Sequence, residues 1–121
     1  MALQTHKDLK VWQESRNLVK AIYKLTSTFP KEEIYSLTQQ IKRSVVSIPS
    51  NIAEGAARES NKEYIHFLYI ALGSVAELET QLQISFDLEF INRESLNDIT
   101  SKLEEIARML SGLISHRKTL A

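Results

Sequence analysis

Residues 60–85 read SNKEYIHFLYIALGSVAELETQLQIS, and the periodicity of this stretch decides the fold. Ser60 precedes Glu63 by three positions, which is the capping-box pattern of a helix N-terminus. The seam positions then follow at alternating intervals of four and three residues, as in a heptad repeat. They are Tyr64, Leu68, Ala71, Val75, Leu78, Leu82 and Ser85. The stretch therefore predicts one long helix whose seam packs against other helices.

Two further helices are predicted on its N-terminal side. The first runs from about Asp8, a potential N-cap, to about Thr28, and Pro30 closes it. The second begins around Pro30 and ends around Gly55. The periodicity of its apolar residues continues through Pro49, where we expect a kink. Each helix carries a stripe of apolar residues on one face. That of the first helix comprises Val11, Trp12, Leu18, Val19, Ile22, Leu25 and Phe29, and that of the second comprises Ile34, Leu37, Ile41, Val45, Ile48 and Ile52.

A fourth helix follows Asn92, a residue suited to an N-cap. Its stripe comprises Leu96, Ile99, Leu103, Ile106, Leu110 and Leu113. The chain has only three glycines and two prolines, and strand-like alternation is missing. Similar helix lengths and short connectors predict an all-α fold, an antiparallel up-down-up-down four-helix bundle that forms a single domain over residues 1–121.

The composition excludes several classes of protein. Fifteen Lys and Arg balance fifteen Asp and Glu, so the chain is neither a polybasic tail nor a disordered acidic protein. It has no cysteine, hence no disulfide or thiolate site. The longest apolar run is Phe67 to Leu72, too short to cross a membrane, and we expect a cytoplasmic protein with no membrane partner.

The third predicted helix carries more apolar surface than one bundle core uses. Its second stripe lies one position from the seam and continues toward the end of the helix, and it comprises Ile65, Tyr69, Leu72, Ala76, Phe86 and Phe90. A helix that is apolar on two sides is buried on two sides. The pattern predicts a homo-oligomer interface. The alternative is that this helix is the central member of an irregular bundle.

Catalytic and metal-binding patterns are weak. Glu63 and His66 match the Glu-x-x-His motif of di-iron bundles, but no second copy of the motif occurs. Glu77 and Glu79 lie two positions apart and therefore on different faces of a helix, which is poor geometry for an acid and base pair. The glycines are isolated, so no phosphate-binding loop is present. We expect no catalytic residue, no metal ligand and no cofactor.

The balanced net charge hides an asymmetry between the two halves of the chain. Residues 1–60 carry a formal charge of +3 and residues 61–121 a charge of −3. The basic residues that form a candidate nucleic-acid surface are Arg16, Lys20, Lys24, Lys42, Arg43 and Arg58. An oligomer would repeat this surface in every subunit. The alternative is a solvated outer face that binds nothing.

Four stretches carry a family resemblance: DLKVWQ at 8–13, SIPSNIAEG at 47–55, FLYIALGS at 67–74 and ELETQL at 77–82. Together they resemble the bacterial 23S ribosomal RNA intervening-sequence protein family, over about residues 9–113. The resemblance implies a long four-helix bundle that assembles as a ring-like homopentamer without known enzymatic activity. Some members are encoded inside insertions in large-subunit ribosomal RNA genes. A related branch, the accessory variability protein of diversity-generating retroelements, pairs with a reverse transcriptase and binds nucleic acid through a basic ring surface.

The chain departs from the family pattern at two positions. Ala57 stands where a second glycine is frequent, so we expect a less sharp turn after Gly55. Glu89 also stands where glycine is common, which argues against a left-handed helix cap there. The balanced charge, unlike that of the strongly basic retroelement branch, weakens the inference of nucleic-acid binding.

The sequence thus predicts a non-enzymatic, oligomeric helical scaffold that associates with RNA or DNA through its basic residues. Two alternatives remain open. One is a protein-only adaptor that recruits another polypeptide through apolar and acidic surfaces. The other is a carboxylate-bridged metal protein built around Glu63 and His66.

Overall fold

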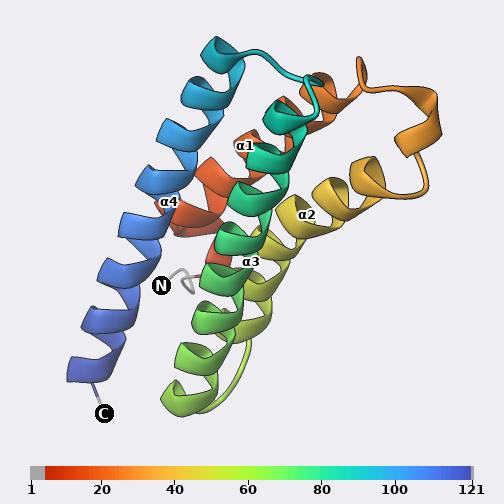
Figure 1. Ribbon diagram of the computed structural model, residues 1–121. Coiled ribbons are helices and arrows are strands. Elements are labelled where there is room, and N and C mark those ends of the chain that lie inside the picture. Colours follow the sequence, from red (N-terminus) through yellow and green to blue (C-terminus); the bar gives the residue numbers. More distant parts are fainter. Residues whose placement is uncertain (1–4, 121) are drawn as a thin grey trace.

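The computed structural model describes residues 5–120, and within them the chain is helical with no strand (Figure 1). A single-turn 3₁₀ helix, η1 (His6–Asp8), precedes α1 (Lys10–Thr26). A second, η2 (Lys31–Glu33), lies in the connector to α2 (Leu37–Ala56). The chain ends with two long helices, α3 (Asn61–Asp87) and α4 (Arg93–Thr119). The predicted all-α class with four main helices is confirmed.

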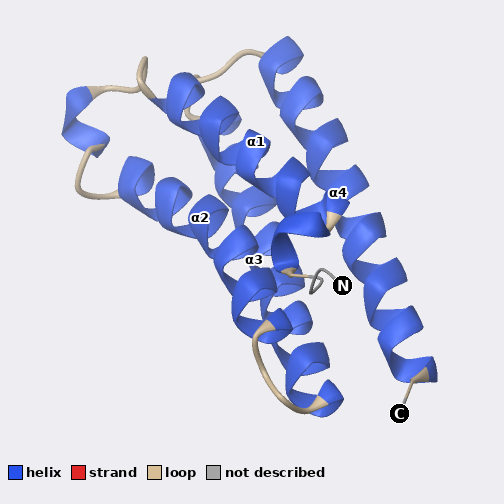
Figure 2. Cartoon of the chain, turned by 180° about the vertical axis from the view of Figure 1, so that it is seen from behind, coloured by secondary structure: helices blue, strands red, loops and turns tan. Residues whose placement is uncertain are grey.

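The four helices pack in the order of the chain. In Figure 1 the chain rises through α1, descends through α2, rises through α3 and descends through α4. Helix α2 packs most extensively on α3, and α1 on α4 least. Viewed from behind in Figure 2, α1 lies between α2 and α4. The connector between α1 and α2 and the one between α3 and α4 meet at one end of the bundle, where the rings of Phe29 and Phe90 lie 5.5 Å apart.

The core consists of one apolar stripe from each helix. All seven predicted seam positions of α3 are buried, which confirms the heptad reading. The side chains of the core with no exposed surface include Ile22 of α1, Ile41, Val45, Ile48 and Ile52 of α2, and Leu103 and Leu110 of α4. Burial of these apolar side chains is the main contribution to the stability of the fold.

Helix α1 begins at Lys10, and the prediction that Asp8 caps it is wrong. Asp8 belongs to η1, where its carboxylate accepts a hydrogen bond from the Thr5 backbone N–H at 3.1 Å. The Thr5 hydroxyl in turn accepts from the Lys7 N–H at 3.2 Å. The N-cap of α1 is Leu9, which makes no side-chain capping bond. Asp8 therefore helps to cap η1, the turn before the helix, and not α1 itself.

Helix α2 begins at Leu37, seven residues later than predicted. Pro30 is extended and caps η2, and Ser36 has non-helical backbone angles, so the segment between them is a separate turn. Ile34, predicted to belong to the buried stripe of α2, is 48% exposed. The helix continues through the buried Pro49 without interruption, so the proline does not divide it. The kink at Pro49 stays a prediction.

The caps of the last two helices follow the sequence, with one correction. The Ser60 hydroxyl accepts from the Glu63 N–H at 3.1 Å, and the Asn92 side chain accepts from the Ser95 N–H at 2.8 Å. At the end of α3, however, Glu89 adopts the left-handed conformation with φ of 65°, although the absence of glycine argued against it. The Phe90 N–H donates to the Ser85 carbonyl and the Glu89 N–H to the Phe86 carbonyl, which is a Schellman motif. These two hydrogen bonds, and the packing of Phe90 on Phe29, hold a glutamate where glycine is favoured.

Candidate nucleic-acid interface

Two adjoining grooves run along the surface where α1 meets α2. One is lined by Arg16, Asn17, Val19, Lys20, Val46 and Pro49. The other is lined by Tyr23, Gln39, Lys42, Arg43, Val46, Ser47, Ser50 and Asn51. Val46 borders both grooves, so they form one continuous surface. We call the four cations on it, Arg16, Lys20, Lys42 and Arg43, the basic face.

Helix periodicity places these side chains together. Arg16 and Lys20 lie one turn apart on α1, and Tyr23 follows Arg16 by seven residues, so all three share a flank of the helix. On α2, Lys42 and Arg43 precede Val46 by about one turn. Helices α1 and α2 pack against each other, and Ile22 of α1 belongs to the same buried core as Val45 and Ile48 of α2.

The basic face is positive without local neutralisation. None of the residues that line either groove is acidic. Among residues 5–120 the ion pairs join Arg58 to Glu54 and Lys102 to Asp98, and neither involves the basic face. Two of its cations instead lie over aromatic rings. The Arg16 guanidinium lies 4.8 Å from the centre of the Trp12 ring, and the Lys42 ammonium 4.8 Å from that of Tyr23.

The other two predicted nucleic-acid residues lie elsewhere. Lys24 lines a groove between α1 and α4 that also contains Asp98 and Lys102. Arg58, in the α2–α3 connector, pairs with the Glu54 carboxylate at 2.7 Å and lies over the Phe67 ring. The structure therefore brings together four of the six predicted residues and separates Lys24 and Arg58 from them.

The six predicted interface residues differ in exposure. Ile65, Leu72, Phe86 and Phe90 are partly buried against the core of their own chain. Tyr69 is 47% exposed, and its hydroxyl bonds with the Lys118 ammonium at 2.8 Å. Ala76 is exposed. Other exposed apolar side chains include Ile70, Ile84 and Leu88 of this region and, in the α1–α2 connector, Tyr35 and Ile34, of which only Ile34 had been predicted to be buried.

Small polar side chains occupy the interface between α2 and α3. The Ser44 hydroxyl donates to the Glu77 carboxylate at 2.6 Å, Ser47 bonds to Ser74, and the Asn51 amide donates to the Ser47 carbonyl at 2.8 Å. The sequence analysis considered Glu77 only together with Glu79, as an acid and base pair, and did not predict its contact with Ser44. Its signal was the pair of serines at 44 and 47, which are three residues apart and therefore share a face of the helix.

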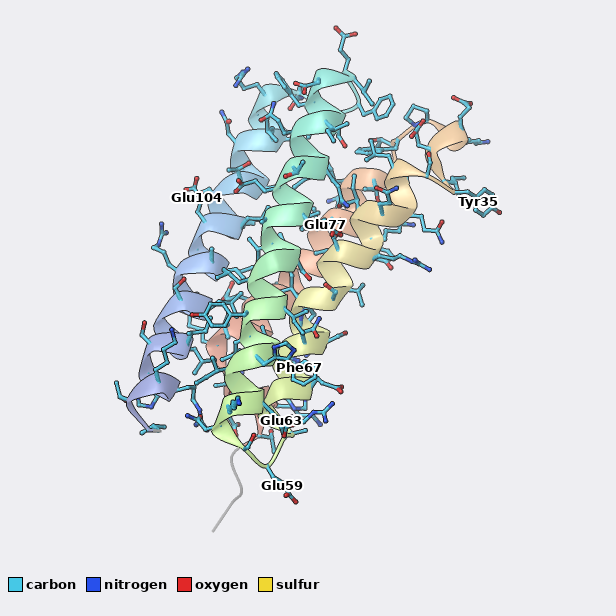
Figure 3. The ribbon with its side chains drawn as sticks, turned by 60° about the horizontal axis from the view of Figure 1, so that its bottom comes forward. Tyr35, Glu59, Glu63, Phe67, Glu77 and Glu104 are labelled. Atoms are coloured by element: carbon cyan, nitrogen blue, oxygen red, sulfur yellow. The ribbon has the colours of Figure 1, made fainter. Side chains whose placement is uncertain are left out.

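Glu63 and His66 do not converge with other ligands. Glu63 lies at the start of α3, near Glu59 at the α2–α3 connector, as Figure 3 shows. His66 is exposed and lies edge-on to the Phe67 ring, at 5.6 Å between ring centres. Over residues 5–120 no three His, Asp or Glu side chains are grouped so that they could hold a metal ion. Over the same part of the chain, no helix combines the length and apolar character needed to span a bilayer.

The C-terminal end of α4 is tied to the start of α3. The Arg117 Nε donates to the Asn61 side-chain oxygen at 2.7 Å, and the Asn61 amide donates back to the Arg117 carbonyl at 2.6 Å. The Arg117 guanidinium also lies 4.5 Å from the centre of the Tyr64 ring. Burial raises the pKa of the Tyr64 hydroxyl above its usual value of 10.0, and the positive charge of Arg117 partly opposes the shift.

The fold and its polar surfaces define an all-helical bundle protein with a basic groove between α1 and α2. The family model described as 23S rRNA-intervening sequence protein matches residues 7–112. The chain belongs to this family, as the resemblance implied.

A solved structure of the same kind supports the assignment. It is a protein of unknown function from the S23 ribosomal protein family of Bacteroides thetaiotaomicron. The two chains are 30% identical and superpose with a TM-score of 0.81, over 87% of this chain and 95% of the other. Among proteins with curated descriptions, none matches this chain.

Proposed function

We propose that this protein is a non-enzymatic, homo-oligomeric helical scaffold of the cytoplasm that binds RNA or DNA through its basic face. The observation that carries the proposal is the pairing of Arg16 and Lys20 of α1 with Lys42 and Arg43 of α2 around grooves that hold no carboxylate. Four unneutralised cations on one surface are suited to bind phosphates, because their binding releases the counterions that are condensed on the nucleic acid.

Oligomerisation would multiply this surface. Helix α3 exposes Ile70 and Ile84, at 39% and 42% of their surface, beside the half-exposed Tyr69. Apolar side chains that stay exposed on one helix are suited to contact a second copy of the chain. The family resemblance favours a pentameric ring. Several copies of the basic face on one assembly would raise the avidity for a long nucleic acid without any new contact.

The test is a titration of structured RNA and of duplex DNA at two salt concentrations. If the four cations of one subunit each neutralise one phosphate, affinity for duplex DNA falls roughly 150-fold between about 50 and about 200 mM salt. A double variant, Lys42→Gln with Arg43→Gln, is expected to weaken binding and to flatten the salt dependence. The control, Lys24→Gln with Lys62→Gln, removes the same charge outside the basic face and is expected to bind more nearly like the wild type. Absence of binding at low salt would exclude the proposal.

A second candidate function is recruitment of another polypeptide. The observation that favours it is the α1–α2 connector, where Tyr35 is 88% exposed and Ile34 is 48% exposed, beside the acidic Glu32. Figure 3 shows Tyr35 at the end of the bundle opposite Glu59 and Glu63. A pull-down that loses its protein partner with Tyr35→Ala, and that is insensitive to nuclease, would favour this alternative.

A further inference from the structure

We propose that the basic face binds single-stranded nucleic acid, with an unpaired base stacked on Tyr23 and the flanking phosphates held by Lys42 and Arg43. The inference rests on the proposed function and adds the form of nucleic acid that the groove takes. It covers RNA and DNA strands alike, because both carry bases and phosphates of the same chemistry.

The groove beside Tyr23 is an open surface groove large enough to receive a base. Its volume is about 520 Å³, within the range of small-ligand sites. Tyr23 contributes the one aromatic ring among its lining residues, and 44% of that side chain is exposed. An exposed aromatic ring in a positively charged groove is the arrangement by which proteins hold single strands, because every base has a face that can stack.

The distance between ring and cation suits one nucleotide. The Lys42 ammonium lies 4.8 Å from the centre of the Tyr23 ring, and Arg43 lines the same groove. Because Lys42 lies over one face of the ring, a base would stack on the other face, with its own phosphate within reach of a positive charge. In a duplex the bases stack on one another and present only their edges in the grooves, so the Tyr23 ring can stack only on an unpaired base.

Polar groups in the same groove remain available for the edge of the base. The Asn51 side chain uses one N–H on the Ser47 carbonyl, which leaves its carbonyl oxygen and its second N–H for a ligand. The Ser50 hydroxyl is exposed, and the described chain offers it no hydrogen bond. Ser47, in contrast, is engaged by Ser74 and by the Ser44 carbonyl.

The adjoining groove, lined by Arg16 and Lys20, extends the proposed binding surface along α1. Arg16, which lines it, lies over Trp12, so a second pairing of cation and aromatic ring occurs about 16 Å along the helix from Tyr23. Trp12 is the only tryptophan of the chain. Binding of a strand at Arg16 is therefore expected to change the fluorescence of a single, identified residue.

The experiment compares strands of equal length on the full-length protein in its native assembly. Labelled oligouridine and oligothymidine of about 20 nucleotides, and RNA and DNA duplexes of the same length, are titrated at low salt by fluorescence anisotropy. Single strands are expected to bind at least about tenfold more tightly than the duplexes, and to alter Trp12 fluorescence, because stacking adds to the phosphate contacts.

The decisive variants act on the ring alone. Tyr23→Ala is expected to weaken single-strand binding roughly 5-fold to 100-fold while leaving the duplexes within about twofold, and Tyr23→Phe is expected to bind as the wild type does. Tyr35→Ala is the matched control, since Tyr35 is an exposed tyrosine outside the grooves. Circular dichroism establishes that each variant keeps its helices.

Two results would overturn the inference. One is equal or tighter binding of the duplexes, and the other is a Tyr23→Ala effect no larger than that of Tyr35→Ala. In both cases nucleic acid still binds and the proposed function stands. Absence of binding by any strand or duplex at low salt would instead contradict the proposed function and, with it, this inference.

Discussion

Gly55 of α2 lies so close to Phe67 of α3 that a Cβ atom built on the glycine would stand 2.9 Å from the Phe67 Cβ. The same atom would lie 3.1 Å from the backbone oxygen of Tyr64. No glycine among residues 5–120 has a positive φ, so Gly55 is required for space and not for backbone freedom. The close approach of α2 and α3 at this end of the bundle depends on the missing side chain.

Replacement of this glycine tests the contact. We expect Gly55→Ala to lower the free energy of unfolding by about 1–3 kcal/mol, because neither the Phe67 Cβ nor the Tyr64 backbone can move without shifting α3. The control is Gly73→Ala, whose Cβ would meet no atom within 4 Å. That change is expected to stabilise the helix by up to about 1 kcal/mol. Urea unfolding followed by circular dichroism measures both. Equal stability of the two variants would show that the helices separate freely.

The left-handed Glu89 predicts a stabilising substitution. Its φ of 65° carries a steric cost that glycine does not have, so Glu89→Gly is expected to raise the free energy of unfolding by about 1 kcal/mol. Its neighbour Leu88 has a φ of −84°, and Leu88→Gly is expected to destabilise the protein by about 0.5–1 kcal/mol. Thermal unfolding of the two variants gives the comparison. A loss of stability in Glu89→Gly would mean that the glutamate makes a favourable contact that offsets its strain.

Tyr64 predicts a loss of stability at high pH. Its pKa is raised in the folded chain because burial disfavours the phenolate, so the unfolded chain releases this proton first as the pH rises. The stabilisation is therefore complete below about pH 10, the unfolded pKa, and declines above it as the pH approaches the folded pKa.

Tyr64→Phe isolates this effect from the titration of other groups. The difference in unfolding free energy between wild type and variant is expected to stay constant from about pH 7 to 9 and then to shift against the wild type above about pH 10. Urea unfolding at each pH supplies the values. A difference that is flat through pH 11, or that moves in favour of the wild type, would contradict the predicted direction.

The exposed face of α3 predicts how the assembly can be disrupted. If a second copy covers Ile70 and Ile84, then Ile70→Glu with Ile84→Glu places charges in the interface and is expected to yield monomers of 13.8 kDa. Ile34→Glu is the control, because Ile34 is similarly exposed but lies in the α1–α2 connector. Light scattering after size exclusion measures the masses. A monomeric wild type at micromolar concentration would rule out the proposed oligomer.

Much of the fold follows from the sequence because its determinants are local. The seam of residues 64–85 repeats within a few turns, and the caps at Ser60 and Asn92 act on the next three residues. The predictions for the start of α2 and the end of α3 were wrong, because local signals conflicted there. Ile34 continues the period of α2, yet it lies outside that helix, because Pro30 and Ser36 have backbone angles that start a separate turn. Glu89 adopts a left-handed conformation that favours glycine. Hydrogen bonds to α3 and the contact between Phe90 and Phe29 hold it there.

By itself, the sequence determined four amphipathic helices, their seams and the family to which the chain belongs. Only the tertiary structure decided which basic residues share a surface. Arg16 and Lys20 meet Lys42 and Arg43 because α1 packs against α2, whereas Lys24, one turn beyond Lys20, borders the groove toward α4. It likewise decided that Ile65 and Leu72 are partly covered while Ile70 and Ile84 are exposed. Periodicity specifies the angle of a side chain about its own helix, but the neighbour that it meets depends on contacts between residues far apart in the chain.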